Sequence, residues 1–417
     1  MIAKFKDNTY ISKPGVPAAG NIIIRETSPE KCQKIVNDFI EKNWRTISRE
    51  PLNQLKYPYL VPGATYNDLW DWDAWFTSCA LPDEALPYMH GSAENLIASP
   101  LRDGRPSKKA SESGEYDYYL HPYPLRAQFA VSVSRRNDCW EWIEPYWETL
   151  QTIMAWYETA ACDSDGFFRW LTLSGIDNDP AVYGRTYGTI AGVDLACFHY
   201  REYTAMGIIA RKLGKVDEYS AKAEALKTFI QQRYYDEKDK FFYAVDRNID
   251  YKVPGRQLIT WDVRLKFKNW TGLYPLWTKC ATPEQAAALR DKVMDENEFL
   301  SPAGVRSHSK DDREIYNNAI SGGPSNWQGP VWGLSTALVV YGLMNYGFSD
   351  EAREVASRML RTFAADITQN GTLHEYYHGD NGQPLIKPGF LNWNSLFYNI
   401  LNNVADGVNP FTFDDLQ

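Results

Sequence analysis

Residues 331–352 read Val331-Trp-Gly-Leu-Ser-Thr-Ala-Leu-Val-Val-Tyr-Gly-Leu-Met-Asn-Tyr346-Gly347-Phe-Ser-Asp350-Glu-Ala352. The run up to Tyr346 is apolar nearly all round, which predicts a helix buried in the interior. The glycine that follows suits a helix stop, and the acidic residues after it suit the positive end of the next helix dipole. The same joint recurs at Gly214-Lys-Val-Asp217-Glu218, so the chain repeats a pair made of one apolar and one amphipathic helix.

The repeat has a measurable period. Candidate outer helices open with a similar acidic phrase at Asp83, Asp217, Glu284 and Asp350. Asp217 to Glu284 is 67 residues, Glu284 to Asp350 is 66, and Asp83 to Asp217 is 134, twice 67; a further start near Asn137-Asp138 fills the gap. A period near 67 divides 417 residues into about six helix pairs, which predicts an all-α chain folded as one (α/α)6 barrel over residues 1–417. An open helical solenoid is the alternative, although its repeats would not need so many polar and aromatic loops.

Composition narrows the classes of function. The net charge of -9 argues against nucleic acid or an acidic membrane surface as a partner. The six cysteines are scattered without a Cys-x-x-Cys, so neither a disulfide framework nor a zinc knuckle is expected. The first thirty residues carry no apolar run and no stretch of eighteen apolar residues occurs, so we expect a cytoplasmic protein without a membrane span. The sequence does not decide between a monomer and a homo-oligomer.

Four long stretches lack a helical pattern, and function is sought in such loops. They are residues 53–73, 99–119, 164–193 and 301–329. Residues 99–119 have the Gly, Ser and Lys content of a lid or of an ordinary solvated loop, and residues 1–28 are interpreted as an N-terminal extension. The aromatic content of 14% exceeds what a core of this size needs and suits a carbohydrate cleft. The densest aromatic segment is Tyr66, Trp70, Trp72 and Trp75, interleaved with Asp68, Asp71 and Asp73.

Two carboxylate candidates lie far apart in the chain. The first is Asp177, in Ser174-Gly-Ile-Asp177-Asn-Asp179-Pro180, where glycine and proline exclude a regular helix and the bend presents side chains. The second is Glu375, 198 residues later and close to three periods of 67, so that in a six-pair ring the two loops face each other across the mouth. Opposed carboxylates suit hydrolysis of a glycosidic bond, because one protonates the leaving oxygen while the other activates water. Groups that grip polyols follow the first candidate, at Tyr183, Arg185 and Tyr187.

The string His374-Glu-Tyr-Tyr-His378 also matches the zinc motif His-Glu-x-x-His. Gly371 before it and the Gly- and Pro-containing residues 379–384 after it leave no long helix to aim both imidazoles. The context predicts a strand-like segment that presents Glu375, with a zinc hydrolase as the remoter alternative. A sugar epimerase or lectin-like barrel would not need carboxylates half a ring apart. We therefore expect no metal and no cofactor.

The chain resembles the (α/α)6 glycosidases of glycoside hydrolase family 63, especially the compact mannosylglycerate and glucosylglycerate hydrolases, and more distantly the family 37 trehalases. The resemblance runs from Tyr57 to about residue 400 and rests on four ordered motifs, at residues 66–76, 174–180, 326–332 and at Glu375. It implies an inverting, exo-acting hydrolase of a small α-glucoside or α-mannoside. Asp177 is then the general acid and Glu375 the general base, while Asp179 supports its loop. The candidate sugar contacts are Tyr66, Trp70, Trp72, Asp73, Trp327, Gln328, Arg185 and Tyr187.

The resemblance leaves the substrate open. Trehalases carry Gly-Gly-Arg-Phe after Val-Pro, whereas this chain reads Val61-Pro62-Gly63-Ala64-Thr65. This departure disfavours trehalose as the substrate, and trehalase is kept as an alternative. A glycerate-bearing substrate needs a cation for its carboxylate. The loops offer Arg102, Arg105, Arg185, Arg306 and Arg313 for that role. The mechanism further predicts that a raised pKa keeps Asp177 protonated near neutral pH while Glu375 stays ionised.

Overall fold

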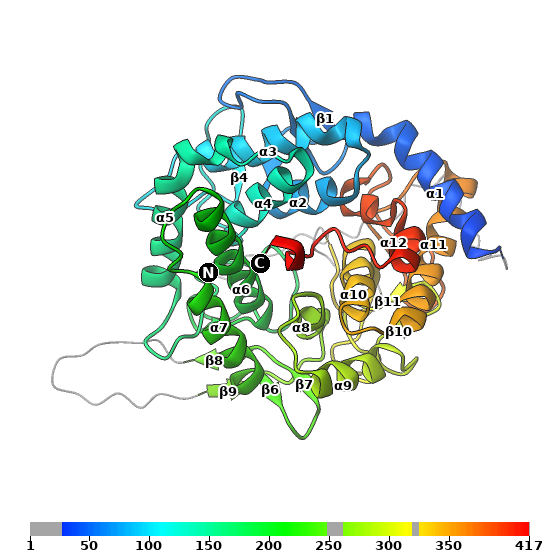
Figure 1. Cartoon of the computed structure of the whole chain (residues 1–417). Helices are drawn as coiled ribbons and strands as arrows, with labels where there is room; N and C mark the ends of the chain where they lie inside the picture. Colours follow the sequence, from blue (N-terminus) through cyan, green and yellow to red (C-terminus); the bar gives the residue numbers. More distant parts are fainter. Residues whose placement is uncertain (1–26, 248–261, 319–324, 417) are drawn as a thin grey trace, which may run out of the picture.

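The computed structural model describes residues 27–247, 262–318 and 325–416 (Figure 1). The N-terminal extension predicted over residues 1–28 lies almost entirely outside this part of the chain. The α-helices are α1 (Pro29–Asn43), α2 (Asp71–Ala80), α3 (Leu86–Ala98), α4 (Arg126–Asn137), α5 (Trp147–Trp156), α6 (Val193–Lys212), α7 (Ser220–Arg233), α8 (Tyr274–Trp277), α9 (Pro283–Val293), α10 (Gly333–Asn345), α11 (Ser349–Asn370) and α12 (Ile400–Asp406). Shorter helical turns are η1 (Trp44–Ile47), η2 (Asp83–Ala85), η3 (Glu141–Tyr146), η4 (Tyr157–Ala161), η5 (Trp270–Leu273), η6 (Asn392–Phe397) and η7 (Asp414–Leu416).

The prediction of an all-α chain needs correction, because short strands connect the loops. They are β1 (Ser48–Arg49), β2 (Tyr59–Leu60), β3 (Leu69–Trp70), β4 (Lys109–Ala110), β5 (Ile190–Ala191), β6 (Tyr235–Asp236), β7 (Phe241–Phe242), β8 (Val245–Arg247), β9 (Asp262–Arg264), β10 (Leu300–Ser301), β11 (Gly304–Val305), β12 (Val331–Trp332) and β13 (Tyr376–Tyr377). Each pairing between them is antiparallel, and β12 with β13 joins loops that are far apart in sequence. Two- and three-residue strands are too short for the period-2 pattern by which a sequence reveals a strand.

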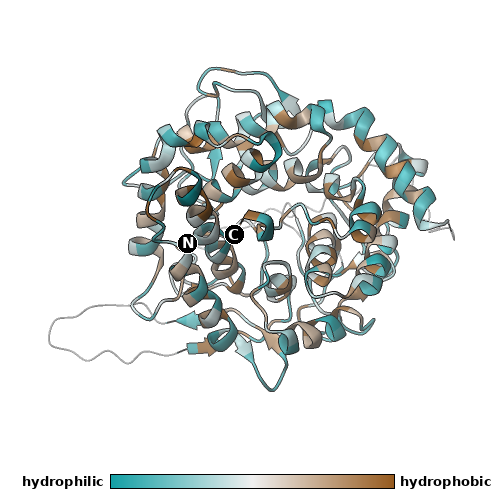
Figure 2. Cartoon of the chain, in the orientation of Figure 1, coloured by the Kyte–Doolittle hydropathy of each residue, from teal (hydrophilic) through white to brown (hydrophobic). Residues whose placement is uncertain are grey.

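The helices alternate between two layers around a common centre (Figure 1). Helices α2, α4, α6, α8 and α10 lie inside, and α3, α5, α7, α9 and α11 follow each of them on the outside. Figure 2 shows the hydrophobic residues gathered on the inner helices, while α1 and α11 carry hydrophilic residues. Helix α10 is buried over almost its whole length, as its apolar sequence predicts.

The two ends of the described chain meet and supply one more pair. Gln33 of α1 donates a side-chain hydrogen bond to the carbonyl of Phe397 (2.8 Å) and accepts one from the backbone of Leu401 (3.0 Å). Asn37 donates to the side chain of Asn399 (2.6 Å). The N-terminal helix α1 therefore covers η6 and α12, which lie inside it.

The predicted joints are confirmed, with shifted boundaries. Gly347 and Gly214 end helices in left-handed conformations, with φ of 79° and 65°. Helix α7 starts at Ser220 instead of Asp217, because the Asp217 carboxylate accepts the backbone N–H groups of residues 219 and 220 and so acts before the helix. The start predicted near Asn137-Asp138 is shifted in the same way, because Asp138 is the left-handed end of α4 and the next helical turn begins at Glu141.

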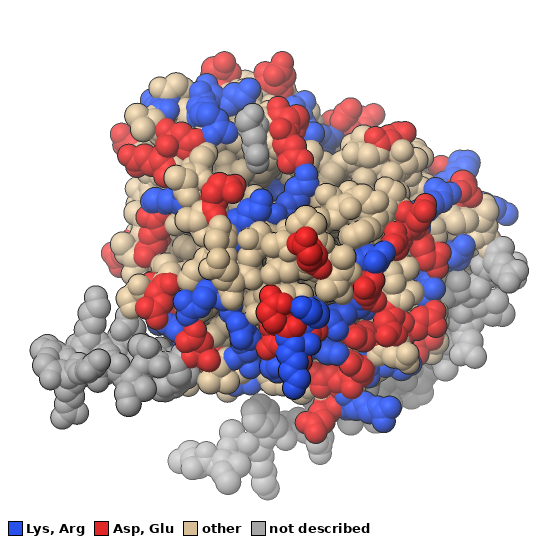
Figure 3. Space-filling view, turned by 60° about the horizontal axis from the view of Figure 1, so that its bottom comes forward, with Lys and Arg blue, Asp and Glu red and all other residues tan. Residues whose placement is uncertain are grey.

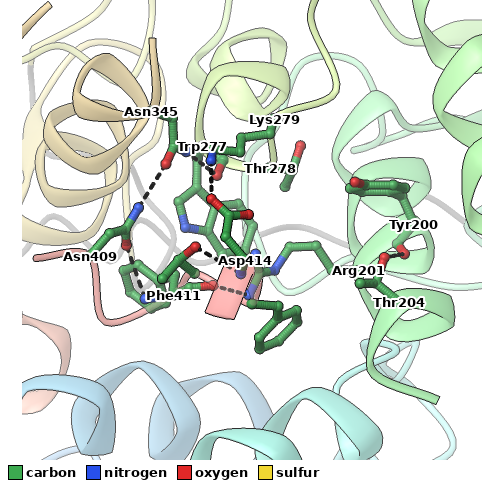
Figure 4. A pocket seen from close by; sticks show the side chains of 12 residues that line it. Tyr200, Arg201, Thr204, Trp277, Thr278, Lys279, Asn345, Asn409, Phe411 and Asp414 are labelled. Carbon is green, nitrogen blue, oxygen red and sulfur yellow. Dashed lines mark hydrogen bonds and ion pairs between the residues drawn. The ribbon is translucent and has the colours of Figure 1, made fainter. Parts of the chain in front are cut away.

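Aromatic side chains fill the centre of the ring of inner helices, between the amino-terminal and the carboxyl-terminal ends of these helices. Trp277 packs edge-on against Trp75 and Phe198, with ring centroids 6.0 and 5.6 Å apart. At the carboxyl ends of α8 and α10, the C-terminal segment crosses this core, and Arg201 donates to the carbonyl of Phe411 (2.8 Å) (Figure 4). The small cavity drawn there is lined by side chains already paired with each other, such as Lys279 with Asp414. We therefore look for the functional site at the opposite, amino-terminal ends of the inner helices.

The surface shows no bias toward one charge on the face drawn in Figure 3, where acidic and basic side chains are intermixed. Within the described residues, every helix is too short or too polar to cross a membrane.

Candidate active site

A pocket of about 630 Å³ opens at the amino-terminal ends of the inner helices. Its walls come from loops before α2, α6, α10 and η6, which are far apart in sequence. The lining residues are Pro62, Tyr66, Trp70, Trp72, Asp73, Lys108, Leu120, Gly175, Asp177, Ser325, Trp327, Glu375, Phe390 and Trp393. The structure thus brings together seven of the ten predicted site residues.

Stacked indoles build the floor and one wall. Trp72, in the first turn of α2, stacks on Tyr123 with ring centroids 4.8 Å apart. Trp327 lies between Trp332 (3.6 Å) and Trp270 (5.1 Å), nearly parallel to both. Because Trp327 is stacked between two rings, it cannot turn and presents only an edge to the pocket, whereas Trp72 is stacked on Tyr123 alone.

The loop that carries Asp177 is locked to the loop before α10. The side chain of Asn178 accepts from the backbone N–H of Trp327 (2.7 Å) and donates to the side chain of Asn326 (3.0 Å). Gln328 donates to the carbonyl of Asn178 (2.8 Å). The bend at residues 174–180 is therefore held by side chains and not by helix or sheet, as its sequence predicts.

The two aspartates of this bend have different environments. Asp177 keeps an exposed face, and its carboxylate accepts a 2.5 Å hydrogen bond from Ser325. Crowding by protein atoms raises the pKa of Asp177, opposed by the Ser325 hydroxyl and the charge of Lys387. Asp179 is buried and accepts from the backbone of Ala181 (2.9 Å) and the side chain of Asn269 (2.8 Å). Asp179 thus holds the loop, whereas Asp177 faces the pocket.

Glu375 is presented by a strand, as predicted from the breakers around it. Its backbone N–H donates to the carbonyl of Ile386 (3.1 Å), and the two residues after it form β13, paired with β12. The side chain is only 6% exposed, and burial raises the pKa of Glu375 to about 7. Lys387, with Nζ 3.3 Å from Oε2, opposes this rise, while the charges of Asp177 and Asp73 add to it. The charges of Asp177 and Glu375 therefore act on each other within one pocket.

Asp73 lies deeper in the same pocket, on the first turn of α2. Residues 71–73 are helical, so the non-helical stretch predicted to residue 73 ends three residues earlier, at residue 70. Asn392 donates to the Asp73 carboxylate (2.6 Å) and accepts from Thr77 (2.7 Å). Burial raises the pKa of Asp73 to about 6. A carboxylate held this way is aimed into the pocket and can accept hydrogen bonds from hydroxyl groups.

A buried ionic cluster supports the pocket from below. Lys108 lies 3.0 Å from one carboxylate oxygen of Asp71, and Arg126 lies 3.5 Å from the other. The Lys108 ammonium also lies 3.6 Å from the ring centroid of Tyr123. Lys108 belongs to the predicted lid, residues 99–119, so the middle of that segment is anchored in the core; the lid role itself stays a prediction.

Three predicted sugar contacts lie outside the pocket lining. The Gln328 amide is engaged by the backbone of Asn178, as described above. Arg185 points to Asp246 (4.0 Å) and the ring of Phe267, and Tyr187 is 56% exposed. The five arginines considered for a substrate carboxylate are likewise not among the lining residues. Among the described lining residues the cation is Lys108, and Lys387 contacts the lining residue Glu375; the sequence singled out neither.

The sequence also missed Asn392 and Trp393. A signal was available, because Asn392-Trp393 repeats the pair Asn326-Trp327 after 66 residues, one period later. No sequence pattern marks Ser325, because its role comes from a contact with Asp177, 148 residues earlier in the chain.

The zinc motif does not form a ligand set. His374 pairs through Nδ1 with the buried carboxylate of Asp366 (2.9 Å), and Nδ1 of His378 accepts from the backbone of Asp380 (3.1 Å). On an extended segment, side chains four residues apart are separated by roughly 13 Å, too far for one ion. Within residues 27–247, 262–318 and 325–416, we find no cluster of three or more His, Cys, Asp or Glu side chains suited to a metal.

A family model places the chain among the glycoside hydrolases. Residues 66–393 match the family described as mannosylglycerate hydrolase MGH1-like glycoside hydrolase domain. This match spans most of the chain, so the protein belongs to that family.

Solved structures share the fold at low sequence identity. The family 63 mannosylglycerate hydrolase from Thermus thermophilus, in complex with glucose, aligns with a TM-score of 0.62 and 15% identity over 88% of this chain and 100% of that one. Neutral trehalase Nth1 from Saccharomyces cerevisiae aligns with a TM-score of 0.64 and 16% identity, covering 93% and 83%.

The sequence relatives are longer proteins. A probable mannosyl-oligosaccharide glucosidase from Schizosaccharomyces pombe is 23% identical over 361 residues, 78% of this chain and 42% of that protein. A probable trehalase from Eremothecium gossypii is 30% identical over 167 residues, 39% of this chain and 20% of that protein. The chain spans between a fifth and two-fifths of the length of these relatives.

Proposed function

We propose that the protein is an inverting, exo-acting α-glycosidase for a small α-glucoside or α-mannoside. The observation that carries the proposal is the placement of Asp177 and Glu375, on separate loops, in one pocket lined by indoles. A pocket closed below by Trp72 and Trp327 suits one terminal sugar and not the middle of a long chain. In this proposal the alternating helices form the six-hairpin (α/α)6 barrel, with α1 and η6–α12 as its sixth pair.

Asp177 acts as the acid and Glu375 as the base. In the ligand-free pocket burial raises the pKa of Glu375 to about 7, so at neutral pH it is only partly ionised, contrary to the expectation that it stays fully ionised, and its ionised form is well matched to deprotonate water. Asp177 already has a raised pKa while one face meets solvent. A sugar that covers this face removes the remaining water and raises the pKa further, which keeps the proton available for the leaving oxygen. Tyr66, Trp70, Trp72, Asp73 and Trp327 then contact the sugar.

A comparison of leaving groups tests both roles. On an α-linked disaccharide, Asp177→Asn and Glu375→Gln should each lower kcat/KM by about 10²- to 10⁴-fold. On α-glucosyl or α-mannosyl fluoride, whose fluoride departs without needing a strong acid, Asp177→Asn should retain most of the rate while Glu375→Gln does not. The opposite pattern on the fluoride would exchange the two roles, and near-normal rates on both substrates would remove the residue from catalysis.

A further inference from the structure

Lys387 occupies an unusual place beside the proposed base. It follows Ile386, whose carbonyl accepts the backbone N–H of Glu375, so Lys387 and Glu375 lie on the two arms of one hairpin, near the antiparallel bridge between Tyr377 and Pro384. Its backbone has φ of 49°, in the left-handed region, which turns the chain at this point. The residue is thus set next to Glu375 by the hairpin itself.

The ammonium of Lys387 joins two walls of the pocket. Nζ lies 3.3 Å from Glu375 Oε2 and donates a 3.2 Å hydrogen bond to the Tyr66 hydroxyl, which comes from the loop before α2. Across the residues that the structure describes, Glu375 is the one carboxylate within 4 Å of this ammonium. Within the described part of the chain, Asp177, Asp73 and Tyr376 also act on Glu375, and each carries negative charge when ionised, while the cation Lys108 lines the same pocket and pairs with Asp71.

We propose that Lys387 is a positioning residue for Glu375, keeping its carboxylate ionised and oriented in the pocket. The inference rests on the proposed role of Glu375 as base. A carboxylate that is 6% exposed and faces two other carboxylates is driven toward its neutral form, in which it cannot deprotonate water. One nearby cation reverses part of this effect. The hydrogen bond to Tyr66 fixes the ammonium and, through it, the carboxylate.

The consequence is a specific pH signature. Removing the cation raises the pKa of Glu375, so the acid limb of the kcat/KM profile, which reports ionisation of the base, moves to higher pH. We expect Lys387→Met to shift this limb by about one pH unit, which lowers kcat/KM about tenfold at pH 6 and much less at pH 9. Lys387→Arg keeps the charge and should restore the profile to a large degree.

Two measurements test the proposal. The first is kcat/KM on α-glucosyl fluoride against pH. The second is the ionisation midpoint of Glu375 by infrared spectroscopy, as the difference between each protein and its Glu375→Gln counterpart, which needs no activity. Lys215→Met is the control, because Lys215 is about as exposed as Lys387 but pairs with an exposed carboxylate, Glu144, that does not line the pocket.

The proposal is supported if the ionisation midpoint of Glu375 rises by about one pH unit in Lys387→Met but not in Lys387→Arg or Lys215→Met. A midpoint equal to that of the wild type overturns it, as does a rate lowered equally at every pH. If Lys387→Met folds poorly, Lys387→Gln replaces it, and a thermal unfolding curve checks each protein. If the wild type does not hydrolyse the fluoride, the proposed function fails, while the infrared midpoint still decides the role of Lys387.

Discussion

Asp71→Asn removes the anion at the centre of the buried cluster beneath the pocket. The carboxylate accepts from the backbone N–H groups of Trp72 (2.6 Å) and Tyr123 (3.0 Å) and pairs with Lys108 and Arg126. The neutral amide leaves two cations buried at 1% exposure without their counter-ion. It also places an NH₂ group against at least one N–H donor that the carboxylate satisfied.

The size of the loss follows from this burial. Breaking a buried ion pair by removing one partner costs about 3–5 kcal/mol. Unfolding entropy near 2.1 cal/mol/K per residue gives about 0.9 kcal/mol/K for 417 residues, so the expected fall in Tm is about 4 °C. Asp38→Asn is the matched control, because Asp38 pairs with Lys34 at a similar distance (2.7 Å) but both side chains are largely exposed. Its expected cost is below about 1 kcal/mol, or about 1 °C.

Differential scanning calorimetry of the wild type and both variants measures the two shifts under one condition. The double variant Asp71→Asn, Lys108→Met should lose less than the sum of the single losses, because the second change removes a cation that the first left unpaired. The reasoning is refuted if Asp71→Asn lowers Tm no more than Asp38→Asn, or if the two losses in the double variant simply add.

Three further predictions concern the buried interior and the C-terminal segment. Burial raises the pKa of Asp194 to about 7, so the folded state binds this proton more tightly than the unfolded state. The free energy of unfolding therefore falls as pH rises from about 4 through about 7. Asp194→Asn should reduce that fall by up to about 4 kcal/mol, which would be seen as a smaller loss of Tm between pH 5 and pH 8. Gly272→Ala would place a Cβ 2.4 Å from the Phe241 ring and 2.5 Å from the carbonyl oxygen of Phe242, so we expect the free energy of unfolding, measured by urea denaturation, to fall by about 3 kcal/mol. Gly214→Ala, whose Cβ meets open space, should lower it by about 1 kcal/mol. Equal losses in the two variants would argue against crowding as the cause. Arg201→Met removes the hydrogen bond to Phe411 and the cation over the Phe413 ring (4.4 Å), so amide hydrogens of residues 409–416 should exchange faster while those of α1 keep their rates; unchanged exchange at 409–416 would show that Arg201 does not hold this segment.

The sequence predicted the helical repeat because the signal is local and periodic. Gly214 and Gly347 end inner helices, and acidic residues open the outer ones, which are properties of single segments. Boundaries shifted where one side chain acted outside the helix, as Asp217 does before α7. The short strands were missed, since two-residue strands are defined by their partners in other loops.

The same distinction between local sequence signals and contacts between loops explains which site residues were predicted. Asp177, Glu375 and the indoles stood out because breakers or aromatic clusters mark them in the sequence. Lys387, Ser325 and Lys108 did not, because their roles arise only when loops meet in space. Gln328, Arg185 and Tyr187 were predicted to contact the sugar but do not line the pocket: proximity in sequence to Asp177 or Trp327 does not decide on which side of a loop a side chain lies.

The central claim is that Asp177 and Glu375 cleave an α-linkage by a single displacement. Proton NMR of fresh product, from a panel of trehalose, glucosylglycerate, mannosylglycerate and a kojibiose-type disaccharide, reports both the substrate and the anomer released first. We predict that one member of the panel is hydrolysed and that the sugar attacked by water appears first as the β-anomer and then mutarotates; for trehalose, β- and α-glucose should appear together in equal amounts. Release of the attacked sugar as the α-anomer, which for trehalose means α-glucose alone, would contradict a single displacement.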